Sequence, residues 1–476
     1  MFFLEWKYEL KNLTRSPWLL LLFILPLLFW FAAGNGQKRA EKRQQELASV
    51  NDIVREGDSM AVLLIDSVAG GLKVNVPSWR QPHQPTVFGN NNPRVAGMPP
   101  LPLAGVAVGQ SDLFTHYLQP RLYGEDFMLN YTELANPVPL LFGSFDLAFV
   151  LVFLAPLVVI AFSYNMLSGD RESGTLRLVA SQPLALSHWL SQRLLVRWSL
   201  LAMILIVSFL FAILAVNMKI ADDVFGLFKI VFCILLYLSF WWGLAFWINL
   251  LGKSSAYNAV TLTGIWILLV LILPSFIHQL TQTLYPVPSR AQLLNDLRIV
   301  EKETEHKADS LLQGYYRSHP ELIPADSSTM KAATGWKEYF ASQDLIRAEM
   351  KPMLDIYETR LTQQNNFVDR FRVLSPALLA HDVLLETSGT SGSCYNAYRS
   401  QVKEYAEQWR NYFIPMVFKG ENMTPEAVRN VPHFSFDYDG AGKRVWQNYI
   451  GLFLWTMFAF ASGFVIYKRY HTYRLV

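Results

Sequence analysis

Residues 147–167 read LAFVLVFLAPLVVIAFSYNML and decide the fold class. The stretch contains no Asp, Glu, Lys or Arg, and a helix needs about 20 apolar residues to cross the hydrocarbon core of a bilayer. The whole chain is 52% hydrophobic and only 17% charged, whereas soluble domains carry about 25% charged residues. Residues 147–167 therefore predict a membrane-spanning helix, and the composition indicates that much of the remaining chain also lies in lipid.

Five further segments meet or approach the same length. They are residues 17–33, 198–216, 225–250, 259–280 and 446–467. The first is the shortest, and the aromatic helix before it could extend it. The segment 225–250 is rich in aromatic residues, which fits packing against lipid and its interface better than a substrate path. The sequence thus predicts an α-helical polytopic membrane protein with six transmembrane helices.

The distribution of positive charges predicts the orientation of these helices. Cytoplasmic segments of membrane proteins are enriched in Lys and Arg. With the N-terminus in the cytoplasm, the basic side chains on that side are Lys7, Lys11, Arg15, Arg171, Arg177, Arg193, Arg197, Lys253, Lys468, Arg469 and Arg474. The short loop at residues 217–223, on the other side, sets Lys219 against two aspartates. We therefore expect both termini, including the tail 468–476, in the cytoplasm.

Two long hydrophilic segments, residues 34–144 and 281–444, then lie outside the cytoplasm. They follow the first and fifth spans, so they could pack together into one extracytoplasmic domain built from two insertions. Apolar residues recur at three- and four-residue spacings in much of the second segment, which predicts a mainly helical domain. Residues 38–54 are polar and rich in helix formers, and we expect them to prolong the first span as a stalk.

An amphipathic pattern at helical period marks residues 1–16. Its apolar arc and one basic flank include Phe2, Trp6, Leu10, Lys7 and Lys11. A helix of this kind lies in the membrane interface with its apolar side toward the acyl chains. A plain membrane anchor explains the pattern about as well as a docking role for partner subunits, and both interpretations stay open.

A compact charged projection follows the second span, in residues 168–197. It opens with Asp170, Arg171 and Glu172. Pro183 separates two short helices because proline cannot continue a helix interior. A membrane protein that receives mechanical work from a soluble motor needs a projection of this kind. On composition alone, an ordinary solvated loop is the simpler interpretation.

The string DRESGTLR at residues 170–177, followed by SQP at residues 181–183, resembles the E-x-G-T-L…P motif of ABC-2 type permeases. In that family the segment is the coupling helix that docks on the nucleotide-binding subunit. The resemblance implies an ABC-2, or type V exporter-like, fold. It also implies that coupling to the ATPase involves Asp170, Arg171, Glu172, Gly174, Thr175, Arg177 and Pro183. Of these, Arg171 and Glu172 would supply charge pairs, and Gly174 would allow close approach to the partner.

Five strings in or beside the outer segments resemble one largely uncharacterised branch of this family, related to permeases of nitrous-oxide-reductase maturation and of bacterial gliding. They are PPLPLA (99–104), GQSDL (109–113), GSFDLAF (143–149), SPALL (375–379) and GTS (389–391). The resemblance covers nearly the whole chain. It implies a bacterial inner membrane and an ATP-driven, export-type machine. It also implies a second permease, identical or related, and it names no substrate.

The chain has no ATPase motif of its own. The nearest string to a phosphate-binding loop is LGKSS at residues 251–255, but Trp247 occupies the position of the first glycine. The resemblance therefore implies that ATP and Mg²⁺ bind a separate ATPase subunit, present in two copies. No HExxH, GxSxG or CxxC pattern occurs, and the net charge of +3 does not indicate a nucleic-acid partner. We expect no catalytic residue, no metal site and no cofactor on this chain.

Two function hypotheses follow. The leading one is a permease subunit that couples ATP hydrolysis to export of a substrate across the inner membrane. The rival is a mechanotransmitter that relays cytoplasmic ATP hydrolysis to a periplasmic partner without moving a substrate. Transport needs a continuous polar path between spans two and five of a dimer, and transmission does not. A membrane scaffold without any ATPase would require the resemblance at residues 170–183 to be accidental.

Overall fold

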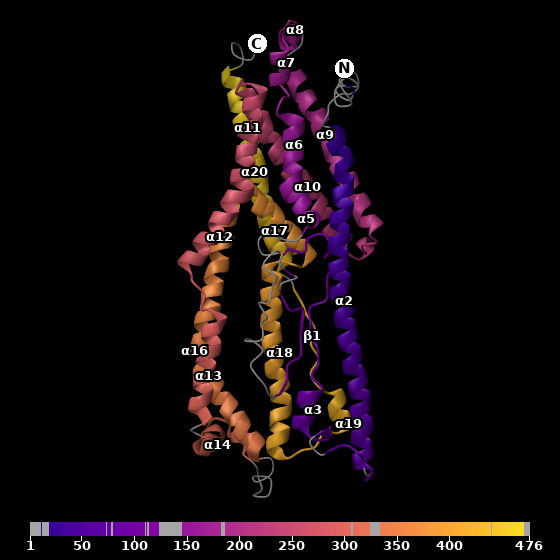
Figure 1. The fold of residues 1–476 in the computed structure, drawn as a ribbon, viewed down its shortest axis with the longest axis vertical. Coiled ribbons are helices and arrows are strands. Elements are labelled where there is room, and N and C mark those ends of the chain that lie inside the picture. The colour runs from indigo at the N-terminus through magenta and orange to yellow at the C-terminus, as the bar shows by residue number, and fades with distance from the viewer. Residues whose placement is uncertain are drawn as a thin grey trace.

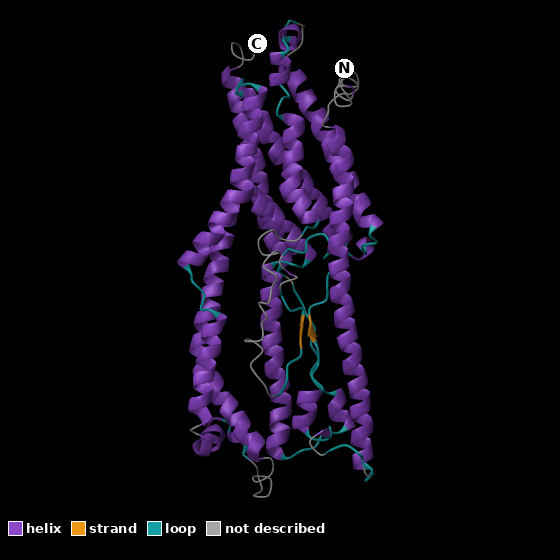
Figure 2. Ribbon diagram, in the orientation of Figure 1, coloured by secondary structure: helices purple, strands orange, loops and turns teal. Residues whose placement is uncertain are grey.

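The protein is long and almost entirely helical. The computed structural model describes residues 11, 19–72, 74–77, 80–109, 111, 114–122, 145–181, 186–305, 308–323, 334–438 and 440–470. The helices run mostly along the long axis of the molecule (Figure 1). In the described part of the chain, strands occur only as one short antiparallel pair, β1 (Ala96–Gly97) with β2 (Tyr117–Leu118) (Figure 2).

Five helical stretches of the described chain are long and apolar enough to cross a membrane. They are Leu147–Glu172, Ser191–Ala215, Val224–Leu250, Ser255–Leu284 and Gly442–Lys468. They coincide with five of the six spans predicted from the sequence, so the chain is an α-helical, multi-pass membrane protein. We number them spans 2 to 6, in the predicted order.

The spans are built from the following elements. Span 2 comprises α5 (Leu147–Phe149), the π-helical η4 (Val150–Leu154) and α6 (Ala155–Ser163), and α7 (Ser168–Glu172) continues the same helical stretch. Span 3 lies in α9 (Leu186–Ala215), and the 3₁₀ turn η5 (Ile220–Asp222) leads to span 4, α10 (Val224–Leu250). Span 5 comprises α11 (Ser255–Trp266), the π-helical η6 (Ile267–Ile272) and α12 (Leu273–Leu284). Span 6 lies in α20 (Ala441–Tyr470).

The first predicted span, residues 17–33, lies partly outside the described residues. Its described part begins α2 (Leu19–Ala69), a single helix that continues from the apolar stretch through the polar residues 38–54. The expected stalk is therefore present. Of the predicted interfacial helix at residues 1–16, only Lys11 is described, so Phe2, Trp6, Lys7 and Leu10 lie outside the described part, as does Pro183.

The far part of α2 packs into a body whose apolar core is separate from the core of the spans. The body also contains α3 (Pro85–Asn91), α13 (Arg290–Glu305), α14 (Ala308–Ser318), η7 (Pro320–Leu322), α16 (Thr334–Phe371), η8 (Arg372–Leu374), α18 (Gly392–Lys419) and α19 (Pro425–Arg429). Aromatic side chains form its core. Trp409 donates from Nε1 to the carbonyl of Gly89 at 2.9 Å, and Tyr398 donates to the carbonyl of Ala96 at 2.8 Å. Both long hydrophilic segments therefore contribute to one core.

One helix of the second hydrophilic segment lies among the spans. This is α17 (Pro376–Ser388), whose buried Ala380, Val383 and Leu384 belong to the same apolar cluster as spans 2 to 6. Its N-cap residue Ser375 accepts a hydrogen bond from Leu378, and Gly389 ends it with φ of +67°. The segment 281–444, predicted as wholly outside the membrane, thus sends one helix back against α10 and α20.

Candidate functional site

The segment that resembles a coupling helix forms a projection beyond the spans, at the opposite end of the molecule from α3 and α19 (Figure 1). It consists of α7 and of α8 (Thr175–Ala180), which we call the α7–α8 projection. Gly174 joins the two helices with φ of +77°. Residues with a Cβ atom rarely adopt this left-handed conformation, so glycine is needed here for the turn itself.

Asp170 fixes the projection to span 3. Its carboxylate forms an ion pair with Arg193 of α9, and both side chains are mostly buried. The Thr175 hydroxyl donates to the carbonyl of Asp170 at 3.1 Å, which stabilises the start of α8. The Arg193 guanidinium also lies over the ring of Trp189, with Cζ 5.2 Å from the ring centroid. Asp170 therefore holds α7 against α9 and sets the position of α8.

Arg171 and Glu172 fix the projection to the turn between spans 4 and 5. Arg171 donates from Nη2 to the carbonyl of Lys253 at 2.6 Å. Glu172 accepts from the backbone N–H of Ser255 at 2.7 Å and from its hydroxyl at 2.9 Å. The resemblance implies that these two residues supply charge pairs for coupling, and this stays a prediction. Their hydrogen bonds within the chain assign them a bracing role.

A buried polar network lies directly beneath the projection. Asn249 accepts from the backbone N–H of Leu167 at 3.2 Å and donates to the carbonyl of Ser163 at 2.8 Å. Asn258 donates to the carbonyl of Tyr164 at 3.1 Å. These bonds satisfy backbone groups where span 2 changes into α7, which would otherwise be costly to bury. The only signal of this network in the sequence is a pair of asparagines close to the ends of apolar runs.

The outer surface of α8 is exposed and partly apolar. Leu176 is only 1% exposed and packs on Leu167 and Leu250, whereas Leu178 is 69% exposed. Gly174, Thr175 and Arg177 are also exposed. One side of α8 thus anchors the projection to the spans, and the other presents Leu178 and Arg177 outward. Leu178 was not among the site residues indicated by the resemblance.

The ion pair of Asp170 with Arg193 leads to a first prediction. We expect Asp170→Asn to loosen the α7–α8 projection, because a hydrogen-bonded ion pair becomes a weaker neutral contact. Losing a hydrogen bond to a charged group shifts a local opening equilibrium by about tenfold. Limited trypsin digestion of the purified chain, monitored at Arg171 and Arg177, should become faster by a similar factor. Asp355→Asn, at an exposed position on α16, is the control; equal cleavage rates in both variants would contradict the bracing role.

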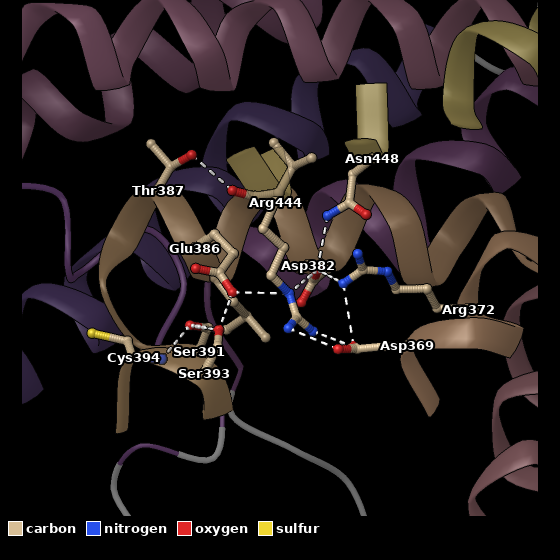
Figure 3. Close-up of polar contacts among 12 residues, drawn as sticks. Asp369, Arg372, Asp382, Glu386, Thr387, Ser391, Ser393, Cys394, Arg444 and Asn448 are labelled. Carbon is tan, nitrogen blue, oxygen red and sulfur yellow. Dashed lines mark hydrogen bonds and ion pairs between the residues drawn. The ribbon is translucent and has the colours of Figure 1, made fainter. Parts of the chain in front are cut away.

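A second polar cluster lies where the body meets the spans (Figure 3). Asp382 of α17 is its centre. Asp382 accepts from Arg372 Nη1 at 2.7 Å, from Arg444 Nε at 3.0 Å and from Asn448 Nδ2 at 2.7 Å. Arg444 also donates from Nη1 to Asp369 at 3.1 Å. This junction cluster therefore ties the end of α16, η8, α17 and the start of span 6 to one another.

Glu386 extends the junction cluster toward α18. Its buried carboxylate lies 3.1 Å from Arg444 Nε and accepts from the Tyr438 hydroxyl at 2.9 Å and from the Ser393 hydroxyl. Burial raises the pKa of the Glu386 carboxyl above its usual value. The hydrogen bond from Ser393 lowers it in part, while the nearby charge of Asp382 raises it further. No member of this cluster stood out in the sequence, because its carboxylates and Arg372 read as ordinary charges of a hydrophilic segment. Arg444, the shared partner of Asp369, Asp382 and Glu386, lies more than 50 residues further along the chain.

The raised pKa of Glu386 predicts a pH dependence of stability. The folded state holds this proton more tightly than the unfolded state does. The contribution of Glu386 to the free energy of unfolding is therefore fully present below the unfolded pKa. It is lost as pH rises from about 4.3 through the folded pKa. We expect Glu386→Gln to flatten this decline in a series of melting temperatures measured in detergent across pH. Glu407→Gln, at an exposed position on α18, should keep the wild-type slope. Parallel curves for both variants would contradict the assignment.

Part of this chain is similar to a known protein family. A family model described as a domain of unknown function, DUF3526, matches residues 289–437. The match covers α13 to α19, and so includes α17 and the junction residues Asp369, Arg372, Asp382 and Glu386. A comparison with curated proteins finds no match. Similarity to DUF3526 thus covers most of the body and the helix that joins it to the spans.

Proposed function

We propose that this chain is the transmembrane permease subunit of an ATP-driven ABC transporter of the export type. The observation that carries the proposal is the α7–α8 projection, which continues span 2 and is braced to span 3 by Asp170 and to the turn between spans 4 and 5 by Glu172. A push on its exposed face would reach four spans together. The resemblance of residues 170–177 to a coupling helix supports the same role.

The proposed complex needs further subunits. This chain carries no phosphate-binding loop, so ATP and Mg²⁺ would be bound by two copies of a soluble ABC ATPase. These copies would dock on the exposed side of α8. A second permease, identical or related, would complete the pathway. The chain would be a non-catalytic subunit, with six spans and an ABC-2 fold, in a bacterial inner membrane. Both termini and the projection would face the cytoplasm, and the body would lie in the periplasm.

One structural feature favours the rival hypothesis of mechanotransmission. Helix α2 continues from the spans to the far end of the body, where Asp58 pairs with Arg94 and Arg94 donates to the carbonyl of Val428 at 3.4 Å. A rigid helix of this kind would carry movement of the spans into the body and onto a periplasmic partner. A structure of the dimeric complex separates the two functions, since transport requires a continuous polar path between the two copies.

The proposal is tested by purification of the tagged chain from its native host in mild detergent. We expect an ATPase with a phosphate-binding loop to copurify, and peptide identification would also show whether the second permease is a related chain. If no ATPase is recovered, even after cross-linking with nucleotide trapped, the transporter proposal fails. The scaffold interpretation would then take its place.

A further inference from the structure

Spans 2 and 5 each contain a π-helical segment followed closely by proline. In span 2, η4 ends at Leu154 and Pro156 follows; in span 5, η6 ends at Ile272 and Pro274 follows. π-helical turns are rare and occur often at functional sites. Proline has no backbone N–H, so a carbonyl in the preceding turn loses its partner within the helix. The hydrogen bonding of each span is therefore weakened at the turn that contains its π-helical segment and the proline after it.

Side chains from other elements supply hydrogen bonds to these carbonyls. The Tyr237 hydroxyl of α10 donates to the carbonyl of Val152 at 3.0 Å, and the Ser375 hydroxyl, the N-cap of α17, donates to the carbonyl of Leu269 at 2.7 Å. Trp266 Nε1 donates across to the carbonyl of Phe153 at 3.2 Å. Most other hydroxyls in the spans bond within their own helix, as Ser275 does to Leu271 at 2.7 Å. Carbonyls of both π-helical segments are thus bonded by side chains of neighbouring helices, and Trp266, the residue directly before η6, bonds η4.

A small cavity beside η4 leaves room for movement. It has a volume of about 20 Å³, and the residues around it include Val152, Pro156, Tyr237, Trp241, Ala380 and Leu384. A void of this size has about the space of one water molecule, and such voids are few in a protein interior. The cavity lies where span 2, span 4 and α17 meet, so η4 is packed less tightly on this side than a filled core would hold it.

We propose that spans 2 and 5 bend at η4 and η6, and that α17 controls the bend. Helix α17 contacts both segments, bonds η6 through Ser375, and is held on its other side by the junction cluster around Asp382. A change in the position of α17 therefore changes which backbone carbonyls of η4 and η6 accept a hydrogen bond. Figure 1 shows α12 leaning outward from the line of α11, the direction in which span 5 bends. The inference goes beyond the proposed transporter function and does not need an ATPase, because it concerns the chain alone.

The bend is tested by electron–electron distance measurements on the full chain in lipid nanodiscs. Cys233 and Cys394, both buried, are replaced by alanine, and spin labels are placed at the exposed positions Val260 and His278, on either side of η6. At 1.5 Å per residue a straight helix would separate these positions by about 27 Å. We expect Ser375→Ala, which removes the bond to Leu269 and also the N-cap bond from Leu378, to raise the population of a second distance by about fivefold or more, since the loss of one hydrogen bond alone implies about fivefold. Pro274→Ala, which restores an N–H, should leave a single narrow distance.

Ser275→Ala is the matched control, because it removes a hydroxyl that bonds within span 5. Its distance distribution should equal the wild type. Tyr237→Phe repeats the test on η4, with faster amide hydrogen exchange expected at residues 150–160. Tyr449→Phe is its control, since Tyr449 donates at 2.6 Å to Lys229 in regular helix. Unchanged distances in both Ser375→Ala and Pro274→Ala would overturn the proposal for span 5, and unchanged exchange in Tyr237→Phe would overturn it for span 2.

Discussion

Replacing Leu178 with glutamate is expected to abolish recovery of the ATPase with this chain while leaving the chain folded. Leu178 is 69% exposed on α8 and belongs to none of the apolar clusters of the described residues. Truncating a hot-spot side chain at the centre of a protein interface costs about 2 kcal/mol, or about 30-fold in affinity, and a buried carboxylate would add a desolvation cost. The amount of ATPase that copurifies with the tagged chain measures the effect.

Leu63→Glu is the matched control for Leu178→Glu. Leu63 is 63% exposed on α2, within the body and far from the α7–α8 projection. Both variants should elute from size exclusion as the wild type does, and only Leu178→Glu should lose the ATPase. Recovery of the ATPase at the wild-type level with Leu178→Glu would place its docking surface elsewhere on the chain.

Replacing Asp382 with alanine is expected to be the most destabilising change in the junction cluster. Arg372, Arg444 and Asn448 would each lose an acceptor, and the two guanidinium groups would have to share Asp369, with Glu386 in reach of Arg444 alone. Removing one partner of a buried ion pair costs about 3–5 kcal/mol. The melting temperature, followed by tryptophan fluorescence in detergent, should fall by many degrees.

Glu358→Ala provides the comparison for Asp382→Ala. Glu358 pairs with Lys403 at 3.8 Å on the surface of the body, where both side chains are more than 40% exposed. Exposed ion pairs contribute about 1 kcal/mol or less, so the melting temperature should change little. Similar small shifts in both variants would mean that the junction cluster does not hold the body to the spans.

The length of apolar runs was enough to predict five spans that the structure contains. Lipid requires about 20 apolar residues in one helix, so residues 147–167 and 225–250 could be recognised without tertiary information. The same rule could not find α17. Its 13 residues are too few to cross a bilayer, and Asp382 and Glu386 make the segment look hydrophilic. Contacts with Arg372 and Arg444 neutralise these charges, and Arg444 lies far from α17 in the sequence.

The α7–α8 projection could be located from the sequence, but the roles of its residues could not be assigned. Arg171 and Glu172 were expected to supply charge pairs for coupling, and their bonds within the chain could not be foreseen, because the turn at Lys253 lies more than 80 residues away in the chain. Arg193 was visible as a positive charge, without its partner. Pro156 and Pro274 were visible too. The π-helical turns beside them could not be predicted, because the side chains that bond their backbone carbonyls come from other helices.

Photo-cross-linking from position 178 in cells of the native host shows directly whether the α7–α8 projection contacts an ATPase. A benzophenone amino acid at this position should cross-link to an ATPase that carries a phosphate-binding loop, and the same group at position 63 should not. That result would place the exposed face of α8 in contact with the motor. If position 178 gives no ATPase product while the ATPase is captured from position 63, the coupling role of the α7–α8 projection is contradicted.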